Sequence, residues 1–350
     1  MTPWLIYGAG GYTGKMIARQ AARLGLRPVL GGRGDNVRTL AQELGLPSVV
    51  FDLADAAGTA QALRGVALVL NCAGPFSATA APMIQACLDA GAHYLDITGE
   101  ITVFEHAHGR HAEAQSRGIV VCPGVGFDVI PTDCIAAALK AALPDATTLA
   151  LGFDTSSGMS PGTAKTLVEG MPLGGMVRRD GAITVVSFGY RRRRIDFGYG
   201  AKAAATIPWG DVATAYYSTG IPNIEAYIPM PAIASALSRW MNWTRPILAR
   251  PAVQAFLKRQ IDRRVPGPDE NQRARSRTAV WGEAVNARGE RRQARIETAN
   301  GYQFTVDSAL LMAERLLAQP PAAGGYYTPS MLYGAQLVEA VAGSGCITVV

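Results

Sequence analysis

Short apolar runs alternate with amphipathic stretches from the start of the chain to about residue 125. The apolar runs suit buried strands, and the stretches between them repeat apolar positions at helical spacing. This alternation is typical of consecutive βαβ units around a parallel sheet. It predicts strands at Trp4–Tyr7, Pro28–Leu30, Ser48–Phe51, Val66–Cys72, His93–Ile97 and Ile119–Cys122. It predicts helices at Gly14–Leu24, Asn36–Leu44, Ala57–Leu63, Thr79–Ala90 and Ile101–Arg117.

The alternation ends after Pro123, where a Gly-rich turn leads to Pro131 and a helix running to Leu143. The later strands follow one another without regular crossover helices, which indicates a mixed or antiparallel sheet. We therefore predict an α/β protein with a doubly wound parallel sheet of the Rossmann type and a second α+β domain. The first domain covers 1–130 and is completed by 325–350, and the second covers 131–324. The later strands are expected at Thr148–Phe153, Ile183–Gly189, Ile195–Phe197, Val280–Asn286 and Arg291–Thr298, with helices at Gly301–Ala318 and Met331–Ala342.

Length and composition agree with two globular domains, because the chain has 350 residues, 49% of them hydrophobic and 17% charged. No uninterrupted apolar run reaches about twenty residues, and the first strand leaves no room for a signal peptide, so we expect a cytoplasmic protein. The formal net charge of +6 favours anionic ligands without requiring nucleic acid, and we expect no nucleic-acid partner.

The cysteines and histidines give no metal-binding pattern. The five cysteines are scattered and odd in number, as expected for reduced thiols, and no Cys-x-x-Cys pair suggests zinc. Three histidines, His106, His108 and His111, are spaced so that they do not share one helix face, and we interpret them as a solvated surface.

A glycine-rich turn lies between the first strand and the first helix. Glycine permits unusual backbone angles and close approach to a pyrophosphate, and the following helix start offers free amides to phosphate. A glycine motif alone is weak evidence, but here the whole downstream alternation supports a dinucleotide site. The turn is formed by Gly8, Ala9, Gly10, Gly11, Tyr12, Thr13 and Gly14.

Arg33 follows directly on the second strand, at the position that distinguishes the two nicotinamide cofactors. An arginine there can hold a 2′-phosphate through two charge-assisted hydrogen bonds, so we predict NADPH (NADP) as the cofactor. A solvated loop arginine is the alternative. Asp52, after the third strand, either contacts the adenine or caps the next helix.

The fourth strand ends in Asn71, Cys72, Ala73, Gly74 and Pro75, at the sheet edge where open α/β folds bind ligands. Small residues let the backbone approach the cofactor, and we count Asn71, Ala73, Gly74 and Pro75 among the cofactor contacts. Cys72 has no base nearby in sequence, so a packed thiol is the favoured interpretation.

Five motifs together resemble the saccharopine dehydrogenase-like oxidoreductases, and most nearly the branch that contains trans-acting enoyl reductases. The resemblance implies an N-terminal Rossmann domain, a second α/β domain, use of NADP and a C-terminal segment that returns to the first domain. It implies reduction of an enoyl-type small-molecule or carrier-bound acyl substrate, with saccharopine-type imine chemistry as the alternative. The motifs are the Gly8–Gly14 turn, Gly32-Arg33, Asn71–Phe76, Tyr94–Glu100 and Gly126–Asp133.

Two acids follow the sixth strand and are the candidate catalytic groups. Asp128 lies in a Gly-rich loop where the chain leaves the first domain, and we expect it to position substrate or supply a proton in a cleft between the domains. Asp133 falls in the first turn of the next helix, where a structural acid is the favoured interpretation.

A basic and aromatic segment, 239–264, raises a different class of function, a cofactor-binding scaffold at a membrane. Arginine and lysine interleaved with tryptophan and leucine are typical of interfacial helices, although Pro246 and Pro251 argue against one continuous helix. The segment predicts weak peripheral contact with the inner membrane surface or with an acidic carrier protein. A solvated domain edge is the alternative, and a homodimer stays open. A second basic run, 191–194, is expected to form a strand surface or turn.

Overall fold

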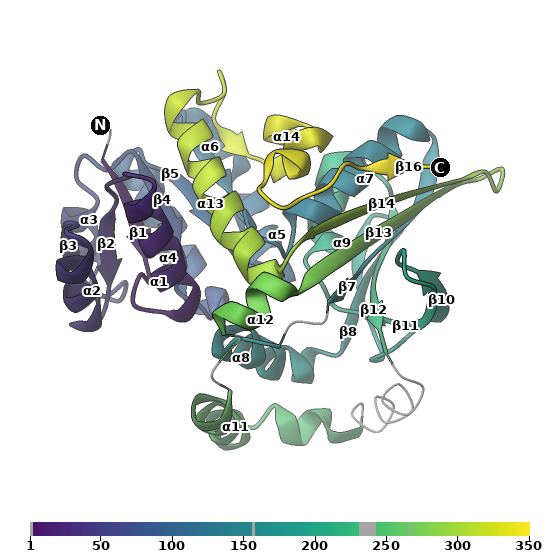
Figure 1. Cartoon of the computed structure of the whole chain (residues 1–350), viewed down its shortest axis with the longest axis horizontal. Helices are drawn as coiled ribbons and strands as arrows, with labels where there is room; N and C mark the ends of the chain where they lie inside the picture. The colour runs from purple at the N-terminus through teal and green to yellow at the C-terminus, as the bar shows by residue number, and fades with distance from the viewer. Residues whose placement is uncertain (1–2, 156–157, 231–242, 266, 268) are drawn as a thin grey trace. The chain divides into compact units, whose positions relative to one another are not determined.

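The computed structural model describes residues 3–155, 158–230, 243–265, 267 and 269–350. The chain divides into two compact units, Met1–Phe127 with Tyr302–Leu332, and Asp128–Gly301 with Tyr333–Val350 (Figure 1). The returning segment therefore begins and ends earlier than the predicted 325–350. The end of the chain joins the second unit because its strand β16 (Thr348–Val349) pairs with the sheet of that unit.

The first unit is built on a seven-stranded sheet with the order β15-β6-β5-β4-β1-β2-β3. Every neighbouring pair is parallel, which confirms the predicted doubly wound sheet. The central strands are buried apolar runs such as Leu5-Ile6 and Leu68–Leu70, as expected for strands covered on both faces. The strands are β1 (Trp4–Tyr7), β2 (Val29–Gly32), β3 (Ser48–Val50), β4 (Leu68–Asn71), β5 (His93–Asp96), β6 (Val120–Cys122) and β15 (Gly325–Tyr326).

The helices of the first unit alternate with its strands. The single helix predicted over 101–117 is instead two helices, because the chain leaves helical geometry at Arg110, directly after Gly109. The long helix α13 (Gly301–Ala318) returns to this unit and buries Phe304 and Leu310. The other helices are α1 (Tyr12–Arg23), α2 (Asn36–Leu44), α3 (Ala56–Ala62), α4 (Phe76–Ala90), α5 (Ile101–Gly109), α6 (His111–Ser116) and α14 (Pro329–Tyr333).

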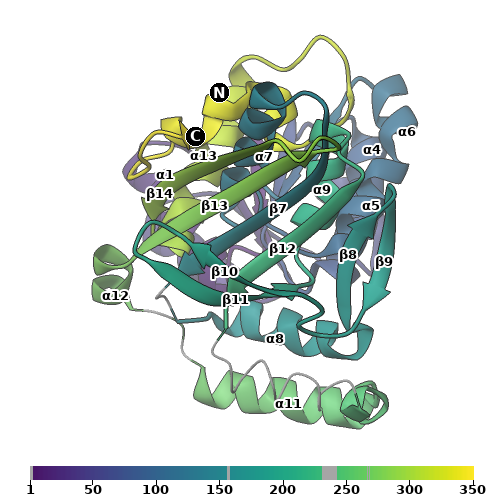
Figure 2. The ribbon, with the colours of Figure 1, turned by 90° about the vertical axis from the view of Figure 1, so that its right-hand side faces the viewer.

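The second unit contains a nine-stranded mixed sheet, whose main path runs β10-β11-β12-β7-β13-β14-β16 (Figure 2). Strands β12 and β7 are parallel and the other pairs are antiparallel, which confirms the mixed sheet. Its strands are β7 (Ala146–Thr155), β8 (Gly175–Arg179), β9 (Ala182–Val186), β10 (Arg192–Asp196), β11 (Ala201–Ile207), β12 (Asn223–Pro229), β13 (Arg277–Asn286), β14 (Arg291–Ala299) and β16.

Helix α7 (Ile130–Ala142) packs on this sheet at Gly282, where the first carbon of any side chain would lie 2.5 Å from Ile135. A glycine in β13 therefore lets the helix approach the sheet closely. The basic run that was predicted as a strand surface or turn is largely the edge strand β10. The remaining helices are α8 (Pro161–Gly170), η1 (Met171–Leu173), α9 (Asp211–Thr219), α11 (Pro251–Arg264), α12 (Glu270–Arg275) and η2 (Ala335–Ala340).

Candidate functional site

The glycine-rich turn forms a narrow cradle between β1 and α1. Gly8 has φ +80°, and a side-chain carbon there would lie 2.7 Å from the Ala73 amide nitrogen. At Gly14 the same carbon would lie 2.3 Å from the Gly8 carbonyl oxygen. Both positions therefore require glycine, the first for its backbone angle and both for space. The cradle brings the turn against the loop after β4, as a dinucleotide fold requires.

The start of α1 is open to an anion. Gly11 is its N-cap residue, no side chain caps the helix, and its first turn, which begins with Tyr12 and Thr13, carries no acid. Gly10 is tied to the start of α2, because Asn36 Nδ2 donates to the Gly10 carbonyl oxygen at 3.3 Å. An uncapped helix start beside a fixed glycine turn has the chemistry that a pyrophosphate needs, so the predicted turn fits the cofactor.

Arg33 and Asp52 follow the neighbouring strands β2 and β3, and both charges act on the Tyr7 hydroxyl. Burial raises the pKa of Tyr7, the negative charge of Asp52 raises it further, and the positive charge of Arg33 lowers it. The Arg33 side chain is exposed, so it is accessible to an anion. Asp52 accepts a hydrogen bond from the Ala54 amide at 3.0 Å, whereas Asp55 caps α3. The helix-capping alternative for Asp52 is therefore wrong.

The loop after β4 is fixed by Asn71. Its Oδ1 accepts from the Ala73 amide at 3.0 Å, and its Nδ2 donates to the Tyr94 hydroxyl at 3.3 Å. Thr79 donates to the Ala73 carbonyl oxygen at 2.5 Å, which holds the segment Ala73-Gly74-Pro75 in place. Burial raises the pKa of the Cys72 thiol, so the reactive thiolate is disfavoured and the packed-thiol interpretation holds.

Asp96 is the centre of a buried hydrogen-bond network at the end of β5. Its Oδ2 accepts from the Tyr94 hydroxyl at 2.7 Å, and its Oδ1 accepts from the amides of Thr98 at 3.0 Å and Gly124 at 2.8 Å. Burial raises its pKa to about 6, although the three hydrogen bonds oppose that shift. Asp96 is therefore mainly ionised near neutral pH, and it joins the ends of β5 and β6 from within the fold.

Helix α13 supplies residues to this region that the sequence pattern did not assign to the site. The Tyr302 ring meets the Tyr12 ring edge-on, with centroids 5.5 Å apart. Thr305 Oγ1 accepts from the Phe127 amide at 3.0 Å, and Ser308 Oγ donates to the Val125 carbonyl oxygen at 2.8 Å. The sequence analysis placed Tyr302 only in the predicted helix Gly301–Ala318, and it lies 290 positions from Tyr12, the residue that it contacts.

Asp128 opens the second unit with a partly exposed side chain. Its carbonyl oxygen accepts from Trp209 Nε1 at 3.0 Å, which fixes the backbone there. Burial alone raises the pKa of its carboxyl to about 7. A carboxyl that is half-protonated near neutral pH has the pKa that suits a general acid.

Asp133 lies in the first turn of α7 and is fully buried, with 0% of its surface exposed. This environment favours the structural role over direct contact with a substrate. Asp211, at the start of α9, is a further acid of this region that the sequence analysis missed. Asp128 and Asp133 both act electrostatically on Asp211, although 83 residues separate it from Asp128.

The geometry around Thr132 favours the protonated form of Asp211. The single Thr132 hydroxyl proton faces two acceptors, the Val129 carbonyl oxygen at 3.0 Å and Asp211 Oδ1 at 2.6 Å. The hydroxyl can donate to one of them only, and a proton on Asp211 would satisfy the other contact. Burial, with only 1% of Asp211 exposed, raises its pKa well above the usual value. Both observations favour the acid form of Asp211.

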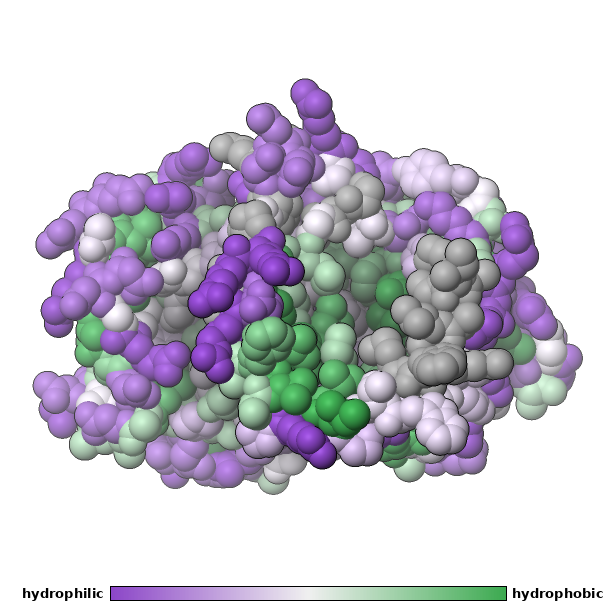
Figure 3. Space-filling view, turned by 90° about the horizontal axis from the view of Figure 1, so that it is seen from below, coloured by the Kyte–Doolittle hydropathy of each residue, from purple (hydrophilic) through white to green (hydrophobic). Residues whose placement is uncertain are grey.

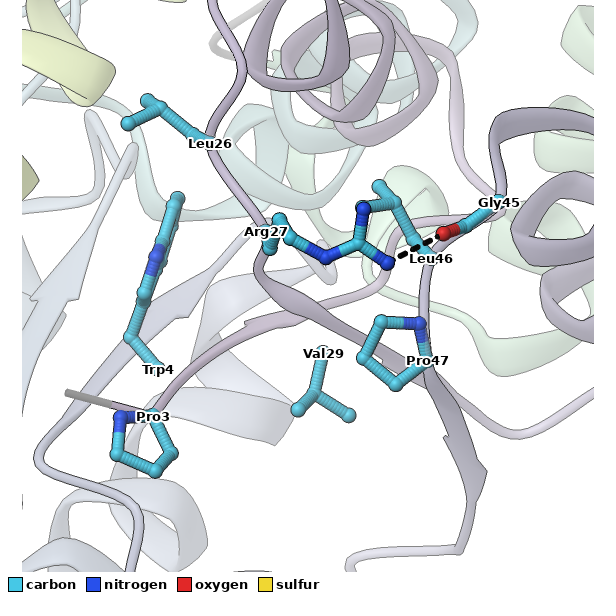
Figure 4. Close-up of a pocket in the computed structure, with 8 residues that line it drawn as sticks. All are labelled: Pro3, Trp4, Leu26, Arg27, Val29, Gly45, Leu46 and Pro47. Carbon is cyan, nitrogen blue, oxygen red and sulfur yellow. Dashed lines mark hydrogen bonds between the residues drawn. The ribbon is translucent and has the colours of Figure 1, made fainter. Parts of the chain in front are cut away.

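A pocket in the first unit lies away from these groups (Figure 4). Trp4 and Val29, in its lining, begin β1 and β2, so the pocket is at the amino ends of the parallel strands. Dinucleotides bind at the carboxyl ends, so this pocket is not the nucleotide site. Arg27 crosses it to donate to the Gly45 carbonyl oxygen at 2.8 Å. The lining is Pro3, Trp4, Leu26, Arg27, Val29, Gly45, Leu46 and Pro47.

Comparison with known proteins gives a consistent result for the first unit. Residues 4–122 match the family described as saccharopine dehydrogenase NADP binding domain. The chain is 29% identical over 150 residues to a mouse saccharopine dehydrogenase-like oxidoreductase, a match covering 37% of this chain and 35% of the relative. It is 34% identical over 141 residues to a trans-acting enoyl reductase of Mycobacterium tuberculosis, covering 37% of this chain and 33% of that one. The matches thus span about a third of each relative.

The fold of the whole chain also has a counterpart among solved structures. Apo saccharopine dehydrogenase (L-Glu forming) from Saccharomyces cerevisiae aligns with a TM-score of 0.69 over 100% of both chains. The sequence identity in that alignment is 10%, so the likeness is one of fold.

Proposed function

We propose that the protein is an NADPH-dependent oxidoreductase that reduces an enoyl-type acyl substrate, starting from the match of residues 4–122 to the saccharopine dehydrogenase NADP binding domain. The observation that supports this proposal most strongly is that one domain contains both the Gly8–Gly14 cradle and an exposed arginine after β2. The first feature suits the pyrophosphate and the second suits the 2′-phosphate.

Bound NADPH supplies the hydride, and the residues of the chain hold it. The open start of α1 would hold the pyrophosphate, Arg33 would pair with the 2′-phosphate, and Asp52 would contact the adenosine part. The backbone of the 71–75 loop, fixed by Asn71, would contact the nicotinamide part. The Asp96 network keeps that loop edge rigid from behind.

The enoyl substrate is proposed from the trans-acting enoyl reductase of Mycobacterium tuberculosis, which is 34% identical to this chain over 141 residues. Reduction of a carbon–carbon double bond adds one hydride and one proton across it. Asp128 is the proposed proton donor, because burial raises the pKa of its carboxyl to about 7, close to the pH at which a general acid works best. The acyl group is free or carried on a carrier protein, and the reaction belongs in the cytoplasm.

The test is NADPH oxidation by the full chain with three acceptors: an α,β-unsaturated acyl thioester, its saturated counterpart, and a mixture of an amino acid with an oxo acid. We expect oxidation only with the unsaturated thioester. Oxidation with the amino-acid mixture alone would replace the enoyl substrate by an imine. Tight NADPH binding without turnover on a broad thioester panel would instead favour a cofactor-binding scaffold.

A further inference from the structure

Helix α11 has an unusual degree of exposure for a helix of a folded unit. None of its described residues is fully buried, and it packs on α8 along one side (Figure 2). On the side that faces α8, Gln254 Nε2 donates a hydrogen bond to the Val168 carbonyl oxygen at 2.9 Å, and Lys258 forms an ion pair with Glu169. The outward side carries Phe256, Arg259 and Arg263, which recur at helical spacing and are all exposed.

Large apolar side chains are also exposed in the segment that precedes α11. Trp243 is 88% exposed, Ile247 51% and Phe256 55%. Leu173, also exposed, belongs to the same region, because Arg245 donates to its carbonyl oxygen at 2.8 Å. Figure 3 shows a group of apolar side chains beside strongly hydrophilic ones on the face seen from below. We name residues 243–264 with Leu173 the α11 surface.

The charge of the α11 surface has one dominant sign. Residues 243–264 contain six arginines or lysines and a single acid, Asp262. Lys258 and Arg245 are engaged with α8 and η1, whereas Arg250, Arg259, Arg263 and Arg264 are exposed to solvent. Pro251 stands in the first turn of α11 after a break in the preceding helical turns, as the prolines predicted. Of the predicted segment 239–264, residues 239–242 lie outside the described part of the chain.

We propose that the α11 surface docks on an anionic lipid bilayer. Exposed tryptophan, isoleucine and phenylalanine beside arginines combine insertion at the acyl boundary with attraction to anionic headgroups. A second copy of the chain would bring like charges together, which opposes association through the same surface. A protein partner would be expected to meet a groove for its apolar anchors, whereas here these side chains project from a helix surface. Among the helices that the structure describes, none combines the length and the hydropathy of a membrane span.

The test is co-sedimentation of the full chain with phosphatidylcholine vesicles, with and without phosphatidylserine. We expect binding only to the anionic vesicles, falling steeply as salt is raised. Arg259→Gln with Arg263→Gln should weaken binding about 25-fold, from about fivefold for each charge near the membrane. Trp243→Ser should weaken it about tenfold, the loss expected for one buried aromatic side chain.

Two control variants test whether binding depends on the α11 surface rather than on the net charge of the protein or on any exposed aromatic ring. Arg64→Gln with Arg117→Gln removes the same charge at exposed positions of the first unit, and Tyr199→Ser removes an exposed ring elsewhere in the second unit. Both should bind vesicles like the unaltered protein. Equal loss in the control variants, or equal binding to neutral and anionic vesicles, would overturn the proposal. Retention on polyglutamate but not on anionic vesicles would assign an acidic protein instead and would also overturn it.

Discussion

Each unit buries a carboxyl, and the hydrogen bonds around the two favour opposite protonation states. In the first unit three donors surround Asp96, so its carboxylate is stabilised despite full burial. In the second unit the one hydroxyl beside Asp211 is that of Thr132, and the Val129 carbonyl oxygen competes for its proton. This shortage of donors favours the acid form of Asp211. The number of donors, more than burial itself, decides whether the group holds a charge or a proton. Asp128 is an intermediate case, because no donor offsets the burial of its carboxyl. Its pKa is raised to about 7, so both protonation states are populated near neutral pH.

The largest expected effect is at Asp128. Asp128→Asn removes the transferable proton and should lower turnover about 10²- to 10⁴-fold, while NADPH affinity stays nearly unchanged. Because the acid form is lost above its pKa of about 7, wild-type turnover should fall about tenfold per pH unit above 7. That fall should disappear in the variant. Steady-state kinetics across pH, with cofactor titration, provide the measurement.

Asp180→Asn is the control for Asp128, because it removes the same charge from an exposed turn at φ +48°, which asparagine tolerates. It should leave turnover and pH profile intact. If Asp128→Asn instead loses folding or cofactor binding and keeps turnover per folded molecule, Asp128 is structural.

Arg33 is the contrasting charged group of the first unit. Its side chain is exposed to solvent, whereas Asp96 is buried among hydrogen-bond donors. Arg33→Ala should erase a preference for NADPH over NADH of about ten- to a hundredfold, the contribution of a charge-assisted pair to phosphate. Titration of both proteins with both cofactors measures it. Equal affinity of the unaltered protein for NADPH and NADH would remove the role given to Arg33.

The same substitution at the two buried acids tests the comparison directly. Asp96→Asn keeps an oxygen for the amides of Thr98 and Gly124 but presents a donor to the Tyr94 hydroxyl, which then lacks its acceptor. The free energy of unfolding should fall by about 1–3 kcal/mol, the cost of an unsatisfied buried group. Denaturant unfolding measures this change, and a neutral result would mean that Asp96 is already protonated.

Asp211→Asn should have the smallest effect, within about 0.5 kcal/mol of the unaltered protein at neutral pH, because the amide donates to Thr132 as the protonated acid does. The same unfolding experiment applies. A loss as large as that of Asp96→Asn would show that Asp211 is ionised and would end the distinction between the units.

The regular parts of the molecule were the predictable ones. Strand β1 and helix α2 have the predicted bounds, because a buried parallel strand and an amphipathic helix each leave a local pattern. Strands β8, β11 and β12 were missed. The sequence of β11, AKAAATI, is rich in alanine, which has little strand preference, so its state is set by its neighbours in the sheet.

Residues of the candidate site could be predicted from the sequence only where they lie close together along the chain. The glycine turn and Arg33 lie within one βαβ unit, so spacing identified them. Tyr302 and Asp211 reach their partners through tertiary folding across long stretches of chain, and no local pattern marks them. The protonation state of Asp211 depends on the direction of the Thr132 hydroxyl, which sequence does not encode.

The central claim, hydride transfer from NADPH to an enoyl group, is tested most directly by isotope transfer. The full chain is incubated with NADPH carrying deuterium at the reactive nicotinamide carbon and with an α,β-unsaturated acyl thioester, and the product is analysed by mass spectrometry. We expect the saturated product to carry one deuterium from the cofactor, and Asp128→Asn to form the same labelled product far more slowly. NADPH binding without any labelled product across a thioester panel, or label appearing in an amine instead, would contradict it.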